Sequence, residues 1–385
     1  MPKIGINDVI VHARSSGTRQ RELNTLQALL PLLLKNNCTP RVYLANDIDD
    51  GLTTKLLGHE FLAYGTRTPI PSVPTYQRVL KGLRYWPQQI NADELDLFHT
   101  SYYPTPRSLA PIVLTVNDLR FLHFPETYAK GRFFFLRCVV GYSIRHASHI
   151  IAISEDTKRD ICHFFGIDSN RVSVAHIPAD PEFSVPVSPE KLLETAKTFN
   201  LPKRFMLYVG HLEPRKNLNR LVQAYLQARR MAGGDFPDLV ILGRKSFGVS
   251  ELESIVHNAI EKGYIRFTGY IPDQYMVSIY RLAESLTFPS LHEGFGIPLL
   301  EAMATDTAIL TSNTSALPEV AGNAALYVDP RCIDDIAHGI SRLATDVNLR
   351  ETLITAGRQR LKAFTSERAA QAVFNAYQIV LQQRK

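Results

Sequence analysis

Short apolar runs rich in β-branched residues alternate with longer segments of helical periodicity, and this pattern most constrains the fold. Such alternation is typical of βαβ units, in which a helix follows each strand of a parallel sheet. In the first half, the runs predicted as strands are 3–6, 41–45, 96–99, 111–116, 149–153 and 171–176. In the second half they are 204–209, 239–242, 264–268, 286–288, 308–311 and 325–328. Ser154 and Asp273 are expected to cap the helices that follow 149–153 and 264–268. We therefore expect two open α/β domains with parallel sheets.

A proline-rich segment separates the two series of strands. The residues 177–190 carry four prolines in fourteen positions, and the periodicity lapses there. We predict an N-terminal domain over 1–180, a linker over 181–200, a C-terminal domain over 201–365 and a C-terminal packing helix over 366–385. Ligands of such domains bind at the carboxyl ends of the strands, so the expected site is the cleft between the domains.

Two glutamates, Glu293 and Glu301, lie eight positions apart around the stretch His-Glu-Gly-Phe-Gly-Ile-Pro. Pro298 suits the first turn of a helix, so we expect Glu293 in a loop and Glu301 one turn inside the helix. Gly294 and Gly296 let the backbone approach a ligand, and the free N–H groups of a helix start favour an anion. The pattern indicates a corner for a phosphate-bearing ligand with hydroxyl groups, such as a nucleotide sugar.

A second candidate is the stretch Gly-His-Leu-Glu-Pro-Arg-Lys-Asn at 210–217, which lies between a predicted strand and a predicted helix. Asn217 is a suitable N-cap for that helix, which would hold Arg215 and Lys216 at the ligand edge of the sheet. A guanidinium beside an ammonium suits a diphosphate. An Arg-Lys pair alone is as well explained by a solvated turn, but its place before a helix and upstream of the glutamates favours binding.

A third candidate set lies where two strands of the first domain end. It consists of His99, Asn117 and Asp118, which we expect to face the cleft and an incoming acceptor. The alternatives are a structural histidine for His99, and a turn with side-chain capping for the Asn-Asp pair.

The net charge is +6, from 43 basic and 37 acidic residues, which is too small an excess to indicate nucleic-acid binding. The four cysteines are scattered, as in a cytoplasmic protein with reduced thiols. We predict no metal site, because the acidic run at 46–50 is better explained as a solvated loop. The basic, aromatic stretch 130–145 predicts a helix that either contacts anionic lipid or packs between domains with solvated arginines.

With these motifs in place, the chain resembles the retaining glycosyltransferases of family 4, which have the two-domain GT-B fold. It is similar to the bacterial branch that includes mannosyltransferases of O-antigen synthesis. The resemblance runs from about residue 95 to the C-terminus, and the segments that carry it are 115–119, 124–126, 151–154, 210–217, 267–270, 288–303 and 317–322.

The resemblance implies an enzyme that moves a sugar from a nucleoside-diphosphate sugar to a glycan or lipid-linked glycan, with mannose preferred. The expected location is the cytoplasm, either without membrane contact or peripheral at the cytoplasmic face of the inner membrane. The resemblance assigns catalytic roles to Arg215 and Lys216, which would bind the diphosphate, and to Glu293, which would lie against the transferring sugar. It implies that Glu301 binds the ribose hydroxyls of the donor. The other residues that it assigns to the donor are Gly210, Tyr270, Ile271, Gly294, Phe295 and Gly296. It implies no cofactor and no metal.

Two departures from the family pattern concern the first domain. Asn117 stands where the family has a histidine, and the first loop, 12–20, has a single glycine. These departures suggest one alternative to a glycosyltransferase, a degenerate partner that binds the sugar nucleotide without transfer. The other alternative is a non-hydrolysing nucleotide-sugar epimerase, which shares the two-domain architecture. The joint presence of Glu293, Glu301, Arg215 and Lys216 argues against the degenerate partner.

Overall fold

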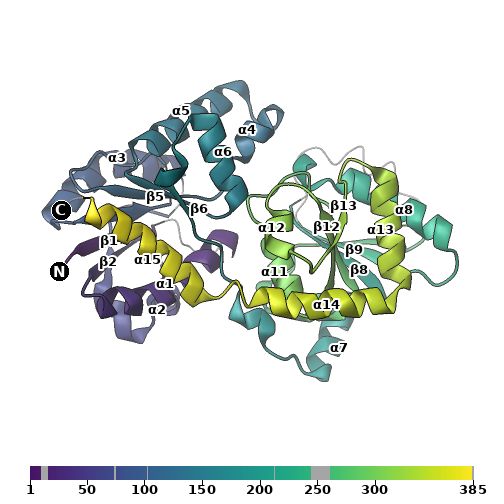
Figure 1. Cartoon of the computed structure of the whole chain (residues 1–385). Helices are drawn as coiled ribbons and strands as arrows, with labels where there is room; N and C mark the ends of the chain where they lie inside the picture. Colours follow the sequence, from purple (N-terminus) through teal and green to yellow (C-terminus); the bar gives the residue numbers. More distant parts are fainter. Residues whose placement is uncertain (10–15, 73–74, 102, 212, 244–260, 384–385) are drawn as a thin grey trace. The chain divides into compact units, whose positions relative to one another are not determined.

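The computed structural model describes residues 1–9, 16–72, 75–101, 103–211, 213–243 and 261–383. The chain forms two compact units (Figure 1). Unit 1 comprises Met1–Pro178 together with Phe364–Lys385, and unit 2 comprises Ala179–Ala363. The C-terminal helix therefore belongs with the N-terminal part of the chain.

Unit 1 contains a parallel sheet in the order β3-β2-β1-β4-β5-β6-β7. Its strands are β1 (Lys3–Asn7), β2 (Thr39–Leu44), β3 (Gly65–Arg67), β4 (Leu97–Thr100), β5 (Ile112–Val116), β6 (His149–Ala152) and β7 (Val172–Val174). Its helices are α1 (Ser16–Lys35), α2 (Asp50–Leu57), α3 (Thr75–Ala92), α4 (Arg120–His123), α5 (Lys130–His146), α6 (Glu155–Phe165) and α15 (Ser366–Gln382). Short 3-10 helices cover His59–Tyr64, Pro125–Thr127 and Ser169–Arg171. Residues 16–20 of the predicted first loop belong to α1, and residues 12–15 lie outside the described residues.

Unit 2 contains a second parallel sheet, in the order β10-β9-β8-β11-β12-β13. Its strands are β8 (Phe205–Val209), β9 (Asp238–Leu242), β10 (Ile265–Gly269), β11 (Ser285–Phe288), β12 (Ala308–Ser312) and β13 (Leu326–Val328). Its helices are α7 (Pro189–Thr198), α8 (Leu218–Ala232), α10 (Met276–Leu282), α11 (Ile297–Ala304), α12 (Leu317–Ala321), α13 (Ile333–Thr345) and α14 (Val347–Leu361). Short 3-10 helices cover Pro181–Ser184, Pro214–Lys216 and Asp273–Tyr275.

The prediction of two parallel α/β sheets is confirmed, and the physical reason is burial on both faces. Every residue of β5, β11 and β12 is buried, because helices cover both sides of a parallel sheet and leave no solvent-facing positions. The C-terminal helix α15 packs on α1, and its Phe374 and Tyr377 belong to the core of unit 1. The segment predicted as a linker, 181–200, lies in unit 2, where α7 packs against α10.

Local capping signals had mixed outcomes. Ser154 caps α6 as predicted, since its side chain accepts a hydrogen bond from the backbone N–H of Thr157. Asp273 was expected to cap the helix after β10, but it lies within a 3-10 turn that begins after Pro272 and makes no side-chain cap there. The turn is closed by a backbone hydrogen bond, which the N–H of Tyr275 donates to the carbonyl of Pro272.

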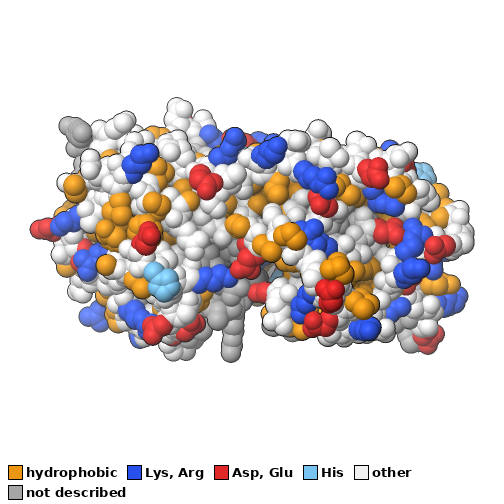
Figure 2. Space-filling view, turned by 90° about the horizontal axis from the view of Figure 1, so that it is seen from below, with side chains coloured by type: hydrophobic (Ala, Val, Ile, Leu, Met, Phe, Trp, Pro, Cys, Tyr) orange, Lys and Arg blue, Asp and Glu red, His pale blue; other side chains and the backbone are white. Residues whose placement is uncertain are grey.

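On the face shown in Figure 2, Lys and Arg side chains are interspersed with Asp and Glu side chains in each unit. Among the described helices, none combines the length and apolar character that crossing a membrane requires. The four cysteines, Cys38, Cys138, Cys162 and Cys332, are not joined in disulfides.

Candidate functional site

The candidate site in unit 2 is built on two neighbouring central strands. β8 pairs with β11, so the turn after β8 and the loop after β11 meet at the carboxyl edge of the sheet. The turn after β8 is the 3-10 helix Pro214–Lys216, and the backbone N–H of Leu291 donates to the carbonyl of Arg215 at 2.8 Å. The fold therefore brings together two segments that lie more than seventy residues apart in sequence.

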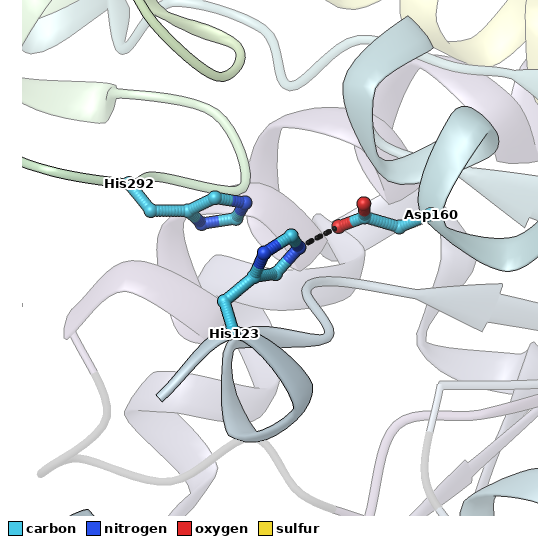
Figure 3. A group of neighbouring side chains, drawn as sticks. All are labelled: His123, Asp160 and His292. Carbon is cyan, nitrogen blue, oxygen red and sulfur yellow. Dashed lines mark hydrogen bonds and ion pairs between the residues drawn. The ribbon is translucent and has the colours of Figure 1, made fainter. Parts of the chain in front are cut away.

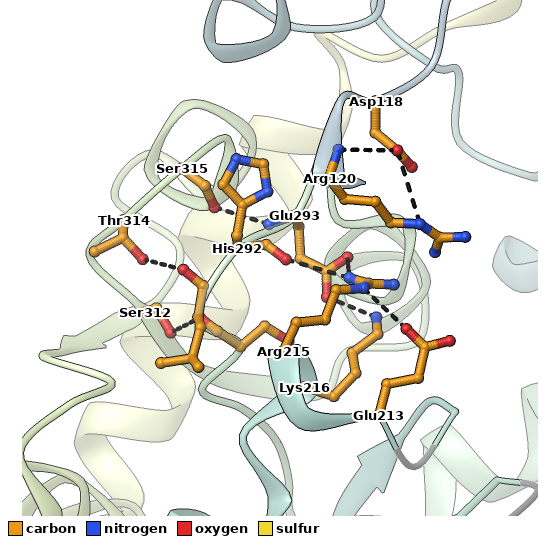
Figure 4. A network of polar contacts seen from close by, with 12 residues as sticks. Asp118, Arg120, Glu213, Arg215, Lys216, His292, Glu293, Ser312, Thr314 and Ser315 are labelled. Carbon is orange, nitrogen blue, oxygen red and sulfur yellow. Dashed lines mark hydrogen bonds and ion pairs between the residues drawn. The ribbon is translucent and has the colours of Figure 1, made fainter. Parts of the chain in front are cut away.

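Two cations converge on the Glu293 carboxylate (Figure 4). The Arg215 guanidinium lies 2.7 Å from Oε2, and the Lys216 ammonium lies 2.6 Å from Oε1. Arg215 also pairs with Glu213 at 3.1 Å and donates to the carbonyl of His292 at 3.2 Å. The three side chains of the cluster are only 10–13% exposed, so their charges act on one another with little screening by water.

Burial and charge act in opposite directions on this cluster. Burial by itself raises the pKa of Glu293, but the charges and hydrogen bonds of Lys216 and Arg215 outweigh it and bring the pKa down to about 2. Burial also lowers the pKa of the Lys216 ammonium, against the opposing effect of Glu293. At neutral pH the site thus holds an ionised Glu293 carboxylate between two cations, one of which also pairs with Glu213.

Hydroxyl side chains at the end of β12 and just after it hold the Glu293 loop in place, and the sequence analysis did not select them. Ser315 accepts a hydrogen bond from the backbone N–H of Glu293 at 3.1 Å (Figure 4). Ser312 donates to the carbonyl of Ser290 at 2.6 Å, and Thr314 donates to the carbonyl of Leu291 at 3.3 Å. The signal was present as a Ser-Asn-Thr-Ser run, 312–315, directly after a predicted strand, at the same edge of the sheet.

The loop then turns into α11 at Gly296. This residue has φ 118°, and a Cβ there would lie 2.9 Å from a methyl of Leu317, so both the conformation and the space require glycine. Pro298 occupies the first turn of α11, as predicted. Gly294 and Phe295 lie between Glu293 and the helix start, and Phe295 is buried. Because the first N–H groups of a helix have no partner within it, this corner suits an anion.

Glu301 lies one turn inside α11, in a different environment. Its Oε2 accepts a hydrogen bond from the hydroxyl of Tyr280 at 2.6 Å, and Tyr280 is fully buried in α10. Burial raises the pKa of Glu301 to about 7, with Asp180 and Asp273 adding to the rise while Tyr280 and Lys216 oppose it. The carboxyl group therefore titrates near neutral pH.

Asn217 occupies the predicted N-cap position of α8, but the side-chain cap expected there does not form. It adopts φ 60°, and its side chain makes no cap hydrogen bond. Its amide instead donates to the carbonyls of Pro289 at 2.9 Å and Pro330 at 2.6 Å. Asn217 therefore ties the Arg215–Lys216 turn to the ends of β11 and β13.

The other donor candidates lie at the ends of β8 and β10. The backbone N–H of Gly210 donates to the carbonyl of Leu242 at 3.0 Å, and a Cβ on Gly210 would lie 3.5 Å from the Lys216 side chain. Tyr270 is 58% exposed after β10, whereas Ile271 is buried. Gly243 also contacts this segment, and the sequence analysis did not select it. A Cβ there would fall 1.8 Å from the carbonyl oxygen of Gly210, so only glycine fits.

The three acceptor candidates all lie in unit 1. Both ring nitrogens of His99 are within 2.7 Å of hydroxyls, Nε2 of Thr115 and Nδ1 of Tyr377, so His99 connects β4 to β5 and α15. Asn117 and Asp118 follow β5 and are half-buried, and the Asp118 carboxylate accepts from the backbone N–H of Arg120 at 3.3 Å.

A further pair near that strand end was not predicted. His123 in α4 lies 2.7 Å from the Asp160 carboxylate in α6 (Figure 3). The hydrogen bond to Asp160 is the main cause that raises the pKa of His123. The pair anchors the short helix α4, which follows Asn117 and Asp118, to α6.

Comparison with known proteins shows that the chain is similar to sugar-transferring enzymes. The family "Glycosyl transferases group 1" matches residues 191–360, and "Glycosyltransferase Family 4" matches residues 25–183. The chain is 29% identical over 285 residues to the O-antigen chain mannosyltransferase B of Escherichia coli, and the match covers 74% of each protein. It is 34% identical over 205 residues to the serotype-specific mannosyltransferase WbdA of Escherichia coli, where the match covers 52% of this chain and 25% of that longer protein.

A solved structure supports the same fold. HepE of Anabaena in complex with UDP-glucose superposes with a TM-score of 0.70 at 18% identity, over 98% of this chain and 99% of that chain. At this identity the likeness concerns the fold alone.

Proposed function

The chain belongs to glycosyltransferase family 4, and from that premise we propose that it transfers a sugar from a nucleoside-diphosphate sugar to a hydroxyl of a surface-glycan acceptor, with retention of configuration. Mannose is the preferred sugar, since the relatives named above are mannosyltransferases. We propose a lipid-linked acceptor and action on the cytoplasmic face of the inner membrane, as expected for the assembly of an O-antigen-like glycan.

The observation that carries the proposal is the convergence of Arg215 and Lys216 on one buried carboxylate beside the start of α11. A diphosphate carries charge that both cations can bind, and a guanidinium binds phosphate oxygens in a bidentate manner. Bound diphosphate would share the two cations with Glu293. The carboxylate would then keep them aligned and accept a hydroxyl of the sugar.

The reaction that we propose breaks the bond between the anomeric carbon and the diphosphate oxygen. The acceptor hydroxyl attacks that carbon from the face that the diphosphate leaves, and its proton passes to the leaving phosphate oxygen. Arg215 and Lys216 stabilise the charge that develops on the leaving group, and an effect of this kind is typically worth about 3–4 kcal/mol. Glu301 would accept hydroxyls of the ribose. No metal or cofactor enters the proposal, because the cations and the helix start supply the positive charge.

The test is a Lys216→Ala variant assayed for sugar transfer. We expect turnover to fall on the order of 10²-fold, because one of the two groups that stabilise the leaving charge is lost. Lys197→Ala, which removes an exposed lysine from α7 in the same unit, is the matched control and should keep wild-type turnover. Wild-type turnover in Lys216→Ala, with transfer by the wild type established, would contradict the proposed role.

The donor can be identified by a thermal-shift screen of nucleotide sugars. A true donor stabilises the folded state by RT ln(1 + [L]/Kd), so one sugar nucleotide should stand out, and we expect GDP-mannose to do so. Release of an epimerised sugar nucleotide without acceptor would instead indicate an epimerase. Calorimetric donor binding with neither transfer nor donor hydrolysis would indicate a degenerate binding partner.

A further inference from the structure

Helices α3 and α5 cover the same face of the sheet in unit 1. The connections from β3 to β4 and from β5 to β6 step across the sheet in the same direction, and crossovers of this kind are right-handed. The connections through α1 and α2 step in the opposite direction, so these helices cover the other face (Figure 1). The solvent side of α3 and α5 is named the α3–α5 face below.

The α3–α5 face has an unusual charge composition. The two helices contain seven Lys and Arg residues and no Asp or Glu. Since the whole chain has an excess of only six basic residues, these two helices account for the excess and the remainder is close to neutral. The basic side chains that are exposed on the two helices are Lys81, Arg84, Lys130, Arg132, Arg137 and Arg145. The nearest acidic groups along the chain are Glu126, which precedes α5, and Asp93 and Glu94, which follow α3 and pair with Arg41 and Lys3.

Large apolar side chains are exposed on the same two helices. Leu80 and Leu83 of α3 are 63% and 52% exposed, and Phe134 and Phe135 of α5 are 69% and 57% exposed. In α5 the core side is already formed by Val140 and Ile144, so the adjacent phenylalanines form a second apolar side. Single exposed apolar residues are ordinary, but exposed apolar pairs on two basic helices of one face are characteristic of an interaction surface.

We propose that the α3–α5 face docks onto an anionic phospholipid bilayer. Lysine and arginine side chains are attracted to anionic headgroups, and leucine and phenylalanine side chains insert at the boundary of headgroups and acyl chains. A nucleic acid would use the basic side chains but would leave the leucines and phenylalanines in water. The combination of the two residue classes therefore favours lipid.

The position of α5 gives this surface a role in acceptor delivery, and that consequence rests on the proposed function. α5 begins shortly after the carboxyl end of β5, where Asn117 and Asp118 lie, and runs back towards the start of β6. Its exposed phenylalanines are in the first half of the helix, near the edge that carries the acceptor candidates. A lipid-linked glycan would thus reach that edge from the same membrane to which the unit is bound.

The test is co-sedimentation of the full chain with vesicles of phosphatidylethanolamine and phosphatidylglycerol, with phosphatidylcholine vesicles as the neutral comparison. We expect binding to the anionic vesicles that weakens as salt is raised. The double variant Phe134→Ser/Phe135→Ser should bind the anionic vesicles at least about tenfold more weakly than the wild type. The double variant Lys81→Glu/Arg84→Glu should weaken this binding by a similar factor. The matched control is Leu193→Ser/Met231→Ser, which removes equally exposed apolar residues from unit 2 and should bind like the wild type.

The outcomes separate this proposal from the proposed function, because vesicle binding requires no sugar donor. Equal binding to both vesicle types, or unchanged binding of the phenylalanine variant, would overturn the docking proposal while leaving the thermal-shift response to a sugar nucleotide intact. Binding of duplex nucleic acid that is insensitive to the phenylalanine variant would overturn it in favour of a polyanion site. An unaltered circular dichroism spectrum of each variant shows that loss of binding is not loss of fold.

Discussion

Glu293 and Glu301 are the same residue type, eight positions apart, yet their surroundings drive their charge states in opposite directions. Glu293 lies between two cations, which bring its pKa down to about 2. Glu301 lies beside the neutral hydroxyl of Tyr280, and burial raises its pKa to about 7. The site therefore combines a carboxylate that is charged at all but strongly acidic pH with one that becomes charged only near neutral pH.

The difference teaches that burial alone does not decide the charge of a carboxyl group. Burial has the largest single effect on each glutamate, and by itself it would raise the pKa of both. The presence of Arg215 and Lys216 reverses the result for Glu293, because a nearby opposite charge stabilises the ionised form. In the folded chain, Glu293 therefore neutralises the charge of the buried cations. Glu301 instead changes its protonation state, and with it its hydrogen bonding, near neutral pH.

The largest effect should come from removing the Glu293 charge. In Glu293→Gln, Arg215 and Lys216 stay buried without their shared counter-charge, which should cost about 3–5 kcal/mol of unfolding free energy at neutral pH. Denaturant unfolding followed by circular dichroism measures the loss. The single tryptophan, Trp86, is buried in unit 1, so its fluorescence transition reports on the other unit as an internal reference.

The control for this change is Glu194→Gln, which removes an exposed carboxylate paired with Lys191 in α7. It should alter stability by no more than about 0.5 kcal/mol, as is usual for surface pairs. If Glu293→Gln were as stable as this control, the two cations would not depend on Glu293 and the comparison of the two glutamates would fail.

The second-largest effect concerns how the contribution of Glu301 to the unfolding free energy changes with pH. Because its folded pKa is raised, the folded state binds a proton more tightly than the unfolded state, and stability is lost as pH rises from the ordinary value near 4.5 to about 7. Glu301→Gln keeps an acceptor for Tyr280 but cannot ionise. Relative to wild type it should gain about 3 kcal/mol of unfolding free energy between these pH values.

Unfolding midpoints of wild type and Glu301→Gln, measured from pH 4.5 to pH 8, test this expectation. Parallel curves would show that Glu301 titrates normally. Glu293 has the opposite sign, because its folded pKa is depressed. Its contribution to stability is complete above pH 4.5 and is lost as pH falls towards 2.

The smallest effect should come from the backbone support of Glu293. Ser315→Gly removes the hydroxyl that accepts from the Glu293 N–H, and glycine is compatible with the φ of 55° at this position. The loss should be about 1 kcal/mol of unfolding free energy. Nucleotide-sugar affinity should fall about fivefold by the same argument.

Thr314→Ala is the comparison for this variant, since it removes a hydroxyl bonded to the Leu291 carbonyl instead of to Glu293. It should leave nucleotide affinity closer to the wild-type value. Equal affinity losses in the two variants would show that the hydroxyls support the loop as a whole and not Glu293 in particular.

Buried strands were the easiest elements to predict. All twelve predicted strands are present in the described residues, because a parallel strand that is covered on both faces is a continuous apolar run that stands out in the sequence. The short edge strand β3, Gly65-Thr-Arg67, was missed, since it has no apolar residue to mark it. The motifs around Glu293 and Lys216 were recognised from glycine, proline and charge spacing along single segments.

Predictions that depended on a partner elsewhere in the chain were less secure. Asn217 was expected to cap the helix that follows it, yet its amide bonds to carbonyls 72 and 113 residues away. The cap of α6 by Ser154 was predicted correctly because both partners lie within three residues. A side chain that can bond locally can also bond at a distance, and nothing in the local sequence separates the two outcomes.

The amino-acid sequence by itself determined the two series of βαβ units, the turn that carries Arg215 and Lys216, and the loop and helix that carry Glu293 and Glu301. These features follow from periodicity and turn chemistry, which act over a few residues. Only the tertiary structure decided that the two cations share Glu293, that Tyr280 bonds Glu301, and that the basic helices α3 and α5 lie on one face of a sheet. Charge state and surface composition depend on groups that are close in space and distant in sequence, so they emerge only when the chain is folded.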